Sequence, residues 1–344
     1  MDDKSSRVRY FDLLRTFAIF FVIVIHCVAP LFTSLAIDSK SWLVSNIFES
    51  ISRWAVPVFI MISGALLLGK ERGFKLFFKK NILKIVIILV FWNLVYAIVN
   101  QIVSGFSFAS LFADFIGGHY HLWFLYMLIG LYLITPFLKL FINDDKRLKL
   151  FLIISFVFGI MLPQFSDVLS LLPSGWNTVG QSLKHALEIT GFGNLIGYSF
   201  YYVLGYFLHH KAFSSKSRKI VYSVGLIGFA ITFFATWGFS LLCNHPVVAF
   251  LKDLTINNVL LSVTIFIYAK YHTRKDVVTS SLIRVSKYSL GIYVMHALVL
   301  ENLLILLPYM PAYFEVPIKA IICFLITLII SFCFRKIPLL KRIV

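Results

Sequence analysis

The chain has 344 residues, of which 60% are hydrophobic and 14% are charged, and its mean hydropathy is +0.89. These values exclude a soluble globular domain. The formal net charge of +17 does not indicate nucleic-acid binding, because the basic residues fall almost wholly in alternate short loops between apolar runs. That alternation is typical of the cytoplasmic loops of a membrane protein.

Apolar runs long enough to span a bilayer recur along the whole chain, so we predict an all-α polytopic membrane protein. About ten transmembrane helices are expected, at residues 11–34, 48–68, 82–103, 121–142, 148–163, 194–209, 219–243, 255–271, 288–307 and 316–334. Of the 32 Lys and Arg residues, 26 fall on one side of this alternation and five on the other, with Arg15 inside the first helix. The positive-inside rule therefore predicts that both termini are cytoplasmic.

The first predicted helix carries two polar residues, Arg15 and His26, within an apolar run. Eleven positions at 100° each make about three turns, so both side chains project from nearly the same face, roughly 16 Å apart along the axis. With the N-terminus inside, Arg15 lies toward the cytoplasm and His26 in the outer half. Arg15 is either an interfacial anchor or functional, and His26 either a helix-packing donor or functional. Asp12, one turn before Arg15, is a possible partner for it.

The four cysteines, Cys27, Cys243, Cys323 and Cys333, lie in or beside apolar runs without paired or metal-ligand spacing. We expect them to behave as small buried hydrophobic residues rather than as a disulfide framework.

The outer ends of the second and fourth helices supply further candidates. Arg53 could bind an anionic or carbonyl group there, while His121 and Trp123 lie near the outer surface beside His119. His119 and His121 with His185 raise the possibility of a metal, but their spacing does not converge on one helix face, so no metal site is predicted.

His296 and Glu301 belong to the predicted ninth helix and fall toward its outer half. His296 is either a core hydrogen-bonding residue or catalytic, and Glu301 either orients an imidazole or faces water. Lys79 and Lys80 stand in the basic cytoplasmic segment FKLFFKKNILK, which either enforces topology and contacts anionic lipid or holds the phosphates of a nucleotide-like ligand.

Four segments together resemble a known family. RVRYFDLLRTFAIFFVIVIH, SRWAVPVFIMISGALL, HLWFLYMLIGLYLITPFL and YSLGIYVMH are similar, in this order, to blocks of the acyltransferase-3 family of integral membrane acyltransferases. Arg15 and His26 match its first-helix signature, an Arg followed after ten residues by a His. The likeness runs from residue 9 to 296 and is nearest to stand-alone members that add acetyl or succinyl groups to surface or cell-wall glycans.

The resemblance implies one membrane acyltransferase domain over residues 1–344, with no additional soluble domain. It implies a cytoplasmic acyl-CoA co-substrate, acetyl-CoA by default and succinyl-CoA as the other option, with no permanently bound cofactor. The acceptor would be a hydroxyl or amine of a cell-surface glycan or lipid-linked saccharide. His26 would carry the transfer and Arg15 would lie toward the donor. Arg53, Lys79 and Lys80 are donor-side or oxyanion candidates.

The acceptor-side candidates are His121, Trp123, His296 and Glu301. His26 would act either as a general base or as an acyl carrier. Membrane lipid is the other expected partner and nucleic acid is not one. Composition rich in Ile, Phe and Lys suggests a low-GC bacterium, so the expected location is the bacterial cytoplasmic membrane. A multi-span transporter or flippase exporting a glycan or an acylated metabolite is the alternative, although no internal repeat is visible.

Overall fold

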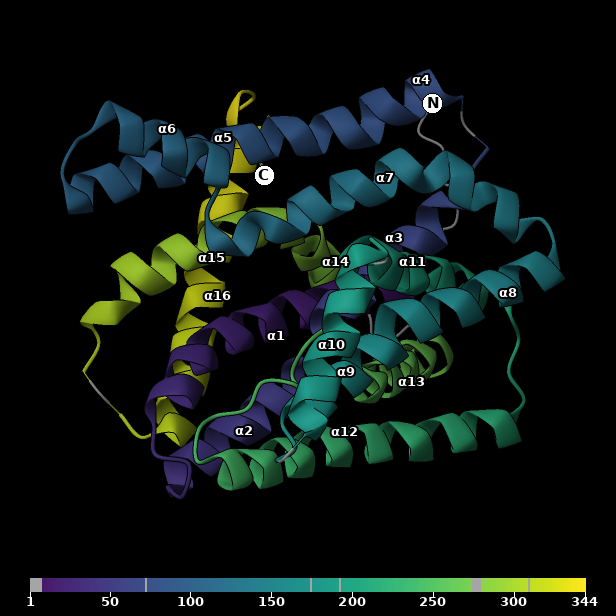
Figure 1. The fold of residues 1–344 in the computed structure, drawn as a ribbon. Coiled ribbons are helices and arrows are strands. Elements are labelled where there is room, and N and C mark those ends of the chain that lie inside the picture. The colour runs from purple at the N-terminus through teal and green to yellow at the C-terminus, as the bar shows by residue number, and fades with distance from the viewer. Residues whose placement is uncertain (1–7, 72, 174, 192, 274–279, 309) are drawn as a thin grey trace.

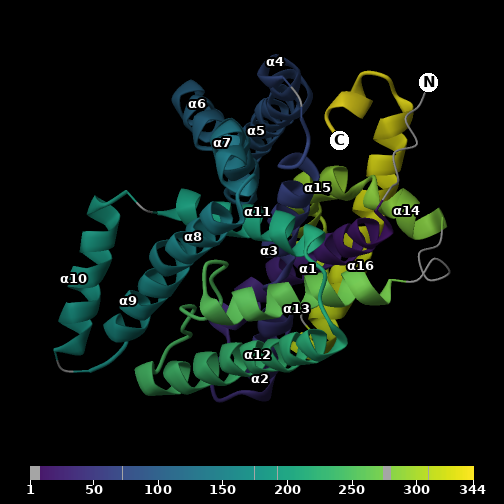
Figure 2. The same cartoon turned by 90° about the vertical axis from the view of Figure 1, so that its right-hand side faces the viewer.

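The computed structural model describes residues 8–71, 73–173, 175–191, 193–273, 280–308 and 310–344. Over these residues the protein is helical and contains no strand (Figures 1 and 2). Its first half comprises α1 (Arg9–Ser34), α2 (Lys40–Ser52), α3 (Ala55–Leu67), α4 (Phe74–Phe77), α5 (Leu83–Ser104), α6 (Phe108–Gly117), α7 (Trp123–Ile142) and α8 (Asp145–Phe156). Its second half comprises α9 (Leu162–Ser170), α10 (Trp176–Ile189), α11 (Asn194–His210), α12 (Ser215–Cys243), α13 (Ile256–His272), α14 (Ser280–Ser286), α15 (Ser289–Asn302) and α16 (Ala312–Lys336).

Helix α1 runs through the middle of the molecule and packs on α2, α3, α14, α15 and α16 (Figures 1 and 2). Helices α5, α6 and α7 stand on one side of this centre, and α12 covers the opposite side. Since α1 carries both Arg15 and His26, its central position places them among the other helices.

The all-α polytopic prediction is confirmed. Within the described ranges, eight helical segments are long and apolar enough to cross a membrane. Helices α11 and α13, each of 17 residues, occupy two further predicted spans and are at the lower end of the length that a span needs. All ten predicted segments are therefore helical.

The second predicted helix, 48–68, is interrupted at Arg53 and Trp54, between α2 and α3. Pro57 has no N–H to donate to the Arg53 carbonyl four residues earlier, so that carbonyl lacks its helical partner. The side-chain amide of Asn258, on α13, donates to it instead at 2.9 Å. A buried polar side chain thus satisfies the backbone group that the proline leaves open, as a low-dielectric interior requires.

Two segments expected as outer loops contain helices. α6 occupies part of 104–120 and α10 part of 164–193, and each begins after a residue outside helical geometry. The hydroxyl of Ser107 caps α6 by accepting from the Ser110 N–H at 3.5 Å. α6 packs along α5, and all of its residues are exposed or half-buried. It therefore forms part of the outer surface on that side of the molecule.

Helix α12 shows which surfaces face lipid. Its buried stripe is made of small and hydroxyl residues, Gly225, Gly228, Thr232, Thr236 and Ser240. Gly225 and Gly228 let α13 approach so closely that an added Cβ would overlap it. The opposite face exposes large apolar residues, Leu226, Ile227 and Phe234 among them. Small residues inside and large apolar residues outside are typical of helices packed within a bilayer.

Contacts between helix ends agree with the predicted alternation of loops. Lys139 at the end of α7 donates to the Lys70 carbonyl after α3. Lys270 at the end of α13 donates to the Lys211 carbonyl after α11 at 2.8 Å. Each contact joins two loops predicted to lie on the same face. The basic residues Lys4, Arg7, Arg72, Arg274 and Lys275 lie outside the described residues, and the cytoplasmic placement of this face stays a prediction.

The four cysteines form no disulfide. Cys27 and Cys323 are buried as expected, Cys243 is half-buried and Cys333 is exposed. Cys333 is one of the outward-facing residues of α16, so the expectation of burial was wrong for it.

Helices α3 and α11 pack in close backbone contact. A Cβ on Gly64 would overlap the Tyr202 carbonyl, and one on Gly205 would overlap the Met61 backbone. Each helix therefore has a glycine at the point where the other's backbone passes. This contact fixes the rotation of α3 about its axis.

We expect Gly64→Ala to lower the free energy of unfolding by about 2–3 kcal/mol, because the added methyl group must separate two backbones. Thermal unfolding of the purified protein in detergent measures this. Gly238→Ala is the matched control, since nothing lies within 4 Å of a Cβ added at that position of α12. A Gly64→Ala protein as stable as the control would show that α3 and α11 are not in backbone contact.

Candidate active site

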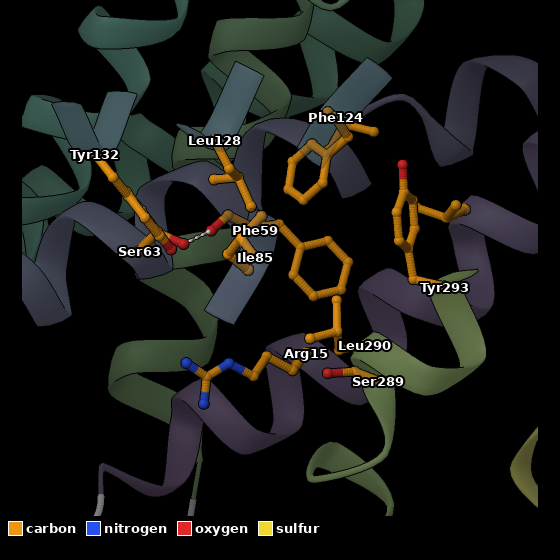
Figure 3. A pocket seen from close by; sticks show the side chains of 12 residues that line it. Arg15, Phe59, Ser63, Ile85, Phe124, Leu128, Tyr132, Ser289, Leu290 and Tyr293 are labelled. Carbon is orange, nitrogen blue, oxygen red and sulfur yellow. Dashed lines mark hydrogen bonds between the residues drawn. The ribbon is translucent and has the colours of Figure 1, made fainter. Parts of the chain in front are cut away.

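A cavity of about 670 Å³, partly open to the exterior, lies between α1, α3, α5, α7 and α15. Arg15 and Val22 of α1 form one wall, and Phe59 and Ser63 of α3 form another. Figure 3 shows the Arg15 guanidinium on the same side of the cavity as Ser63 and Tyr132, with Tyr293 on the other side. The lining is mainly apolar, and Arg15 is its charged residue.

The helical repeat of α1 decides which of its residues face this cavity. Arg15 and Val22 are seven residues apart and share a face, and His26 is one further turn along. His26 does not itself line the cavity. The cavity therefore covers the part of α1 from Arg15 to within one turn of His26.

His26 lies in a group of aromatic rings. Its ring centroid is 4.8 Å from that of His296 on α15 and 5.5 Å from that of Tyr120 before α7. His296 Nδ1 is 2.5 Å from the Tyr293 carbonyl. Because a carbonyl only accepts, Nδ1 carries the proton and Nε2 of the neutral ring is an acceptor. Nε2 is buried and has no hydrogen-bond partner among the described residues.

A chain of hydrogen bonds leads from Glu301 toward the same group. His119 Nε2 is 3.2 Å from a Glu301 carboxylate oxygen, and His119 Nδ1 is 2.8 Å from His121 Nδ1. If His119 donates to Glu301, its Nδ1 must accept, so His121 carries its proton on Nδ1. His121 Nε2 is then bare, and it too is buried without a hydrogen-bond partner in the described part of the chain.

The rings of His121 and His296 are 5.0 Å apart, edge to face. The two rings that carry these bare nitrogens thus belong to one cluster with His26, in a site assembled from α1, the segment before α7, and α15. Such nitrogens can accept a proton, which makes the group chemically suited to general base catalysis.

Tyr293 separates the cavity from these histidines. It lines the cavity, its hydroxyl donates to the His121 carbonyl, and its ring centroid is 5.8 Å from that of His296. Tyr96 of α5 supports the far side of the group by stacking on His119 at 4.2 Å. Arg15, the cavity, Tyr293 and the histidines therefore follow one another across the protein.

Comparison with protein families decides to which class of protein the chain belongs. A family model described as an acyltransferase domain, acyltransferase family 3, matches residues 8–336. The chain belongs to the acyltransferase-3 family. It is a membrane acyltransferase, and the match covers every transmembrane helix described above. No curated protein and no solved structure matches the chain.

The structure brings some of the acyltransferase's expected site residues together and not others. His26, His121 and His296 form one group, and Glu301 joins it through His119. Trp123 packs its ring 5.5 Å from that of Tyr198 on α11 and makes no ring contact with the described histidines. Lys79 and Lys80 are exposed in a π-helical turn, Phe78–Ile82, at the start of α5. They do not line the cavity, but Ile85, slightly further along, does.

Arg53 of the acyltransferase is paired with Glu49, four residues earlier on α2. Its Nε is buried and has no hydrogen-bond partner among the described residues. The Arg53 charge also acts on His26 and on Asp253. Arg53 therefore has a carboxylate partner and retains one donor that the described residues do not use.

Asp12 is buried, and Ser286 donates to its carboxylate at 2.7 Å. That bond ties the start of α1 to the end of α14. Within the described chain, no group of three or more His, Cys, Asp and Glu side chains has the geometry of a metal site. His185 lies on exposed α10, away from His119 and His121.

The sequence did not identify Tyr120 and Tyr293 of the acyltransferase as site residues. Tyr120 stands between the two singled-out histidines of HYH, and Tyr293 stands one turn before His296. Tyrosine is common in an aromatic-rich membrane chain, so its type alone carried no signal. Their position in the site follows only from the folded structure, in which Tyr120 lies 5.5 Å from His26 and Tyr293 lines the cavity beside His296.

Burial raises the pKa of the Asp253 carboxyl, in the loop before α13, to about 6, and the nearby Arg53 charge opposes this. An acid whose folded pKa is raised destabilises the fold as pH rises from its unfolded pKa through its folded one. Asp253→Asn removes that cost. We therefore expect the melting temperature of Asp253→Asn to exceed that of the wild type by about 2 °C more at pH 8 than at pH 4.5.

Thermal unfolding at the two pH values measures this difference. Asp38→Asn, at an exposed loop carboxylate, is the control and should show the same offset at both. An Asp253→Asn offset that does not grow with pH would mean that this carboxyl is solvated.

Proposed function

We propose that the protein transfers an acyl group from cytoplasmic acyl-CoA to a hydroxyl of an extracytoplasmic or lipid-linked cell-surface glycan. Acetyl is the default acyl group and succinyl the other option. The observation that carries this proposal is the cavity that begins at Arg15 and ends at Tyr293, directly beside the histidine group. Family membership supports the reaction class.

The donor's shape and charge match this arrangement. Coenzyme A has anionic phosphates, which do not enter hydrocarbon, and a thin, mainly neutral pantetheine arm. In this proposal the phosphates stay near the basic face, where Lys79 and Lys80 are exposed. The arm enters the cavity past Arg15 and carries the thioester toward His26.

In the direct route, neutral His26 takes the proton of the acceptor hydroxyl as its oxygen attacks the thioester carbonyl. The new C–O bond forms, the C–S bond breaks, and the proton passes from His26 to the departing coenzyme A sulfur. In the second route, a His26 nitrogen first attacks the thioester, the C–S bond breaks, and the ring N–H proton passes to the sulfur, so that coenzyme A leaves as a thiol. The acceptor oxygen then attacks the acyl-imidazole, the C–N bond breaks, and the hydroxyl proton returns to the His26 ring. The unused Nε donor of Arg53 is a candidate for stabilising the oxyanion in either route.

His296 is the proposed positioning residue for His26. Its bare Nε2 can accept a hydrogen bond from the His26 ring and so leave the other His26 nitrogen unprotonated for the acceptor. His121 supplies a second acceptor in the same group.

We expect His26→Ala to reduce acyl transfer at least about a hundredfold, because the proton acceptor or acyl carrier is lost. The measurement is release of free thiol from acetyl-CoA or succinyl-CoA, together with acylation of added surface glycan, by purified protein in detergent. His185→Ala, on exposed α10, is the control and should keep wild-type activity. Wild-type rates in folded His26→Ala would remove His26 from the reaction.

The same assay separates this proposal from a transporter or flippase. A transporter neither cleaves the thioester nor acylates the glycan. If folded wild-type protein neither cleaves the thioester nor acylates the glycan with acetyl-CoA or with succinyl-CoA, the transporter is favoured. Mass spectrometry of surface glycans from cells with and without the intact gene then identifies the acyl group and the acceptor together.

We expect Arg15→Ala to raise the KM for acyl-CoA about tenfold with a smaller effect on kcat, because a cation facing the donor contributes mainly to its binding. Steady-state kinetics with varied acyl-CoA at saturating acceptor measure this split. Arg15→Lys keeps the charge and should recover part of the loss. An unchanged donor KM in Arg15→Ala would place the donor elsewhere.

A further inference from the structure

A second cavity lies on the other side of the histidine group from the Arg15 cavity. It has a volume of about 860 Å³, including its open mouth, and its walls come from the end of α5, from α6 and from the end of α15. These helices lie together at the left of Figure 1. Its polar lining is formed by Tyr96, Asn100, Asp114, Glu301 and Asn302.

The two halves of the site meet at Glu301. Glu301 lines this second cavity and accepts from His119, which in turn contacts His121. The ring of Tyr120 is 4.6 Å from that of His119 and 5.5 Å from that of His26. A ligand resting against Glu301 is therefore only one tyrosine ring away from His26.

Tyr120 is open to a ligand. It does not line the cavity, but it is 55% exposed, and its ring is 4.6 Å from that of half-buried His119, which pairs with the lining residue Glu301. An exposed aromatic ring beside carboxylate and amide groups suits a ring-shaped ligand that has an apolar face and hydroxyl edges.

The charges of the lining restrict the ligand. Asp114 and Glu301 are carboxylates, Asn100 and Asn302 are amides, and no Lys or Arg lines the cavity in the described part of the chain. Carboxylates accept hydrogen bonds from hydroxyl and amine groups but repel phosphates and carboxylates. Asn302 donates its amide to the Leu298 carbonyl at 3.1 Å, so its side-chain oxygen is held in place as an acceptor.

A rival polar cavity of about 690 Å³ lies between α9, α10, α11 and the loop before α13. Its lining includes Lys184 and Lys252 along with Asp167 and Glu188, and Lys252 is paired with Asp167. The positive charges there would suit an anionic ligand. None of the residues that line it contacts the histidine group through a hydrogen bond or ring contact in the described chain.

We propose that the cavity between α5, α6 and α15 binds the acceptor, and that this acceptor is an uncharged or amine-bearing saccharide rather than an anionic polymer. The inference rests on the proposed function and adds the position and the chemical class of the acceptor. Tyr120 supports the sugar ring, while Asp114, Glu301 and Asn302 accept hydrogen bonds from its hydroxyls.

The test uses the purified full-length protein in detergent with acetyl-CoA and succinyl-CoA. Three probes are offered as acceptors: a tetrasaccharide of N-acetylglucosamine, its amine-bearing de-N-acetylated form, and the anionic tetragalacturonate. The variants are Asn302→Ala and Asp114→Asn, the second of which keeps a side-chain oxygen for the Gln101 amide that donates to Asp114 at 3.1 Å. Asn194→Ala and Glu188→Gln in the rival cavity are the matched controls.

We expect the KM for the neutral or amine-bearing tetrasaccharide to rise about tenfold in each variant, since each loses a hydrogen bond to the sugar. The KM for the donor should stay within about twofold of the wild type, which a general loss of structure would not allow. Both controls should behave as the wild type. The kcat/KM for tetragalacturonate should be at least about tenfold lower than for the preferred probe.

The outcomes distinguish this inference from the proposed function. If wild-type protein cleaves neither thioester, the proposed function fails and this inference with it. If the thioester is cleaved but none of the saccharides is acylated, or tetragalacturonate is preferred, the inference about acceptor class is wrong while the donor reaction stands. Wild-type acceptor KM values in Asn302→Ala and Asp114→Asn, with raised values in the two controls, would place the acceptor in the rival cavity.

Discussion

The rest of the structure depends on the close backbone contact between α3 and α11. Gly64 and Gly205 stand where the two helices touch, and neither position has room for a side chain. In a bilayer, apolar side chains gain little by leaving lipid for a helix interface, so close packing of small residues must supply the association. Because this contact takes one face of α3, the other face, with Phe59 and Ser63, is left to line the cavity opposite Arg15.

A second constraint acts on polar groups. No water competes for them within the hydrocarbon region, so each needs a partner inside the protein. Asn258 captures the Arg53 carbonyl, Ser286 donates to Asp12, and His119 joins Glu301 to His121. Two exceptions are informative: the Nε2 atoms of His121 and His296 have no partner in the described chain, and their rings belong to the cluster that contains His26. Arg53 Nε, Asn93 Oδ1, Thr236 Oγ1 and Ser331 Oγ are also buried without a partner there, but the two imidazole nitrogens belong to one ring cluster and are suited to accept a proton.

The site therefore has a donor half and an acceptor half of opposite character. The Arg15 cavity is apolar with one cation, which suits a thin arm attached to an anionic head. The cavity beside Glu301 is polar and carries carboxylates, which suits hydroxyl groups. The histidines and Tyr293 stand between the two. In the proposed reaction this separation lets substrates from opposite sides of a membrane meet without an open path between them.

Part of the fold and part of the site could be predicted from the amino-acid sequence alone. Hydropathy determined the all-α membrane class and the ten helical segments, because crossing a bilayer needs long apolar runs. The helical repeat determined that Arg15 and His26 share a face, and four ordered blocks led to the family. Tertiary structure alone decided that α2 and α3 break at Arg53, that Tyr120 and Tyr293 belong to the site, and that Trp123 packs elsewhere. The physical reason is that lipid-facing and protein-facing surfaces are both apolar, so the one-dimensional pattern does not say which helices touch. Only packing between helices far apart in the chain brings His26, His121 and His296 to one point.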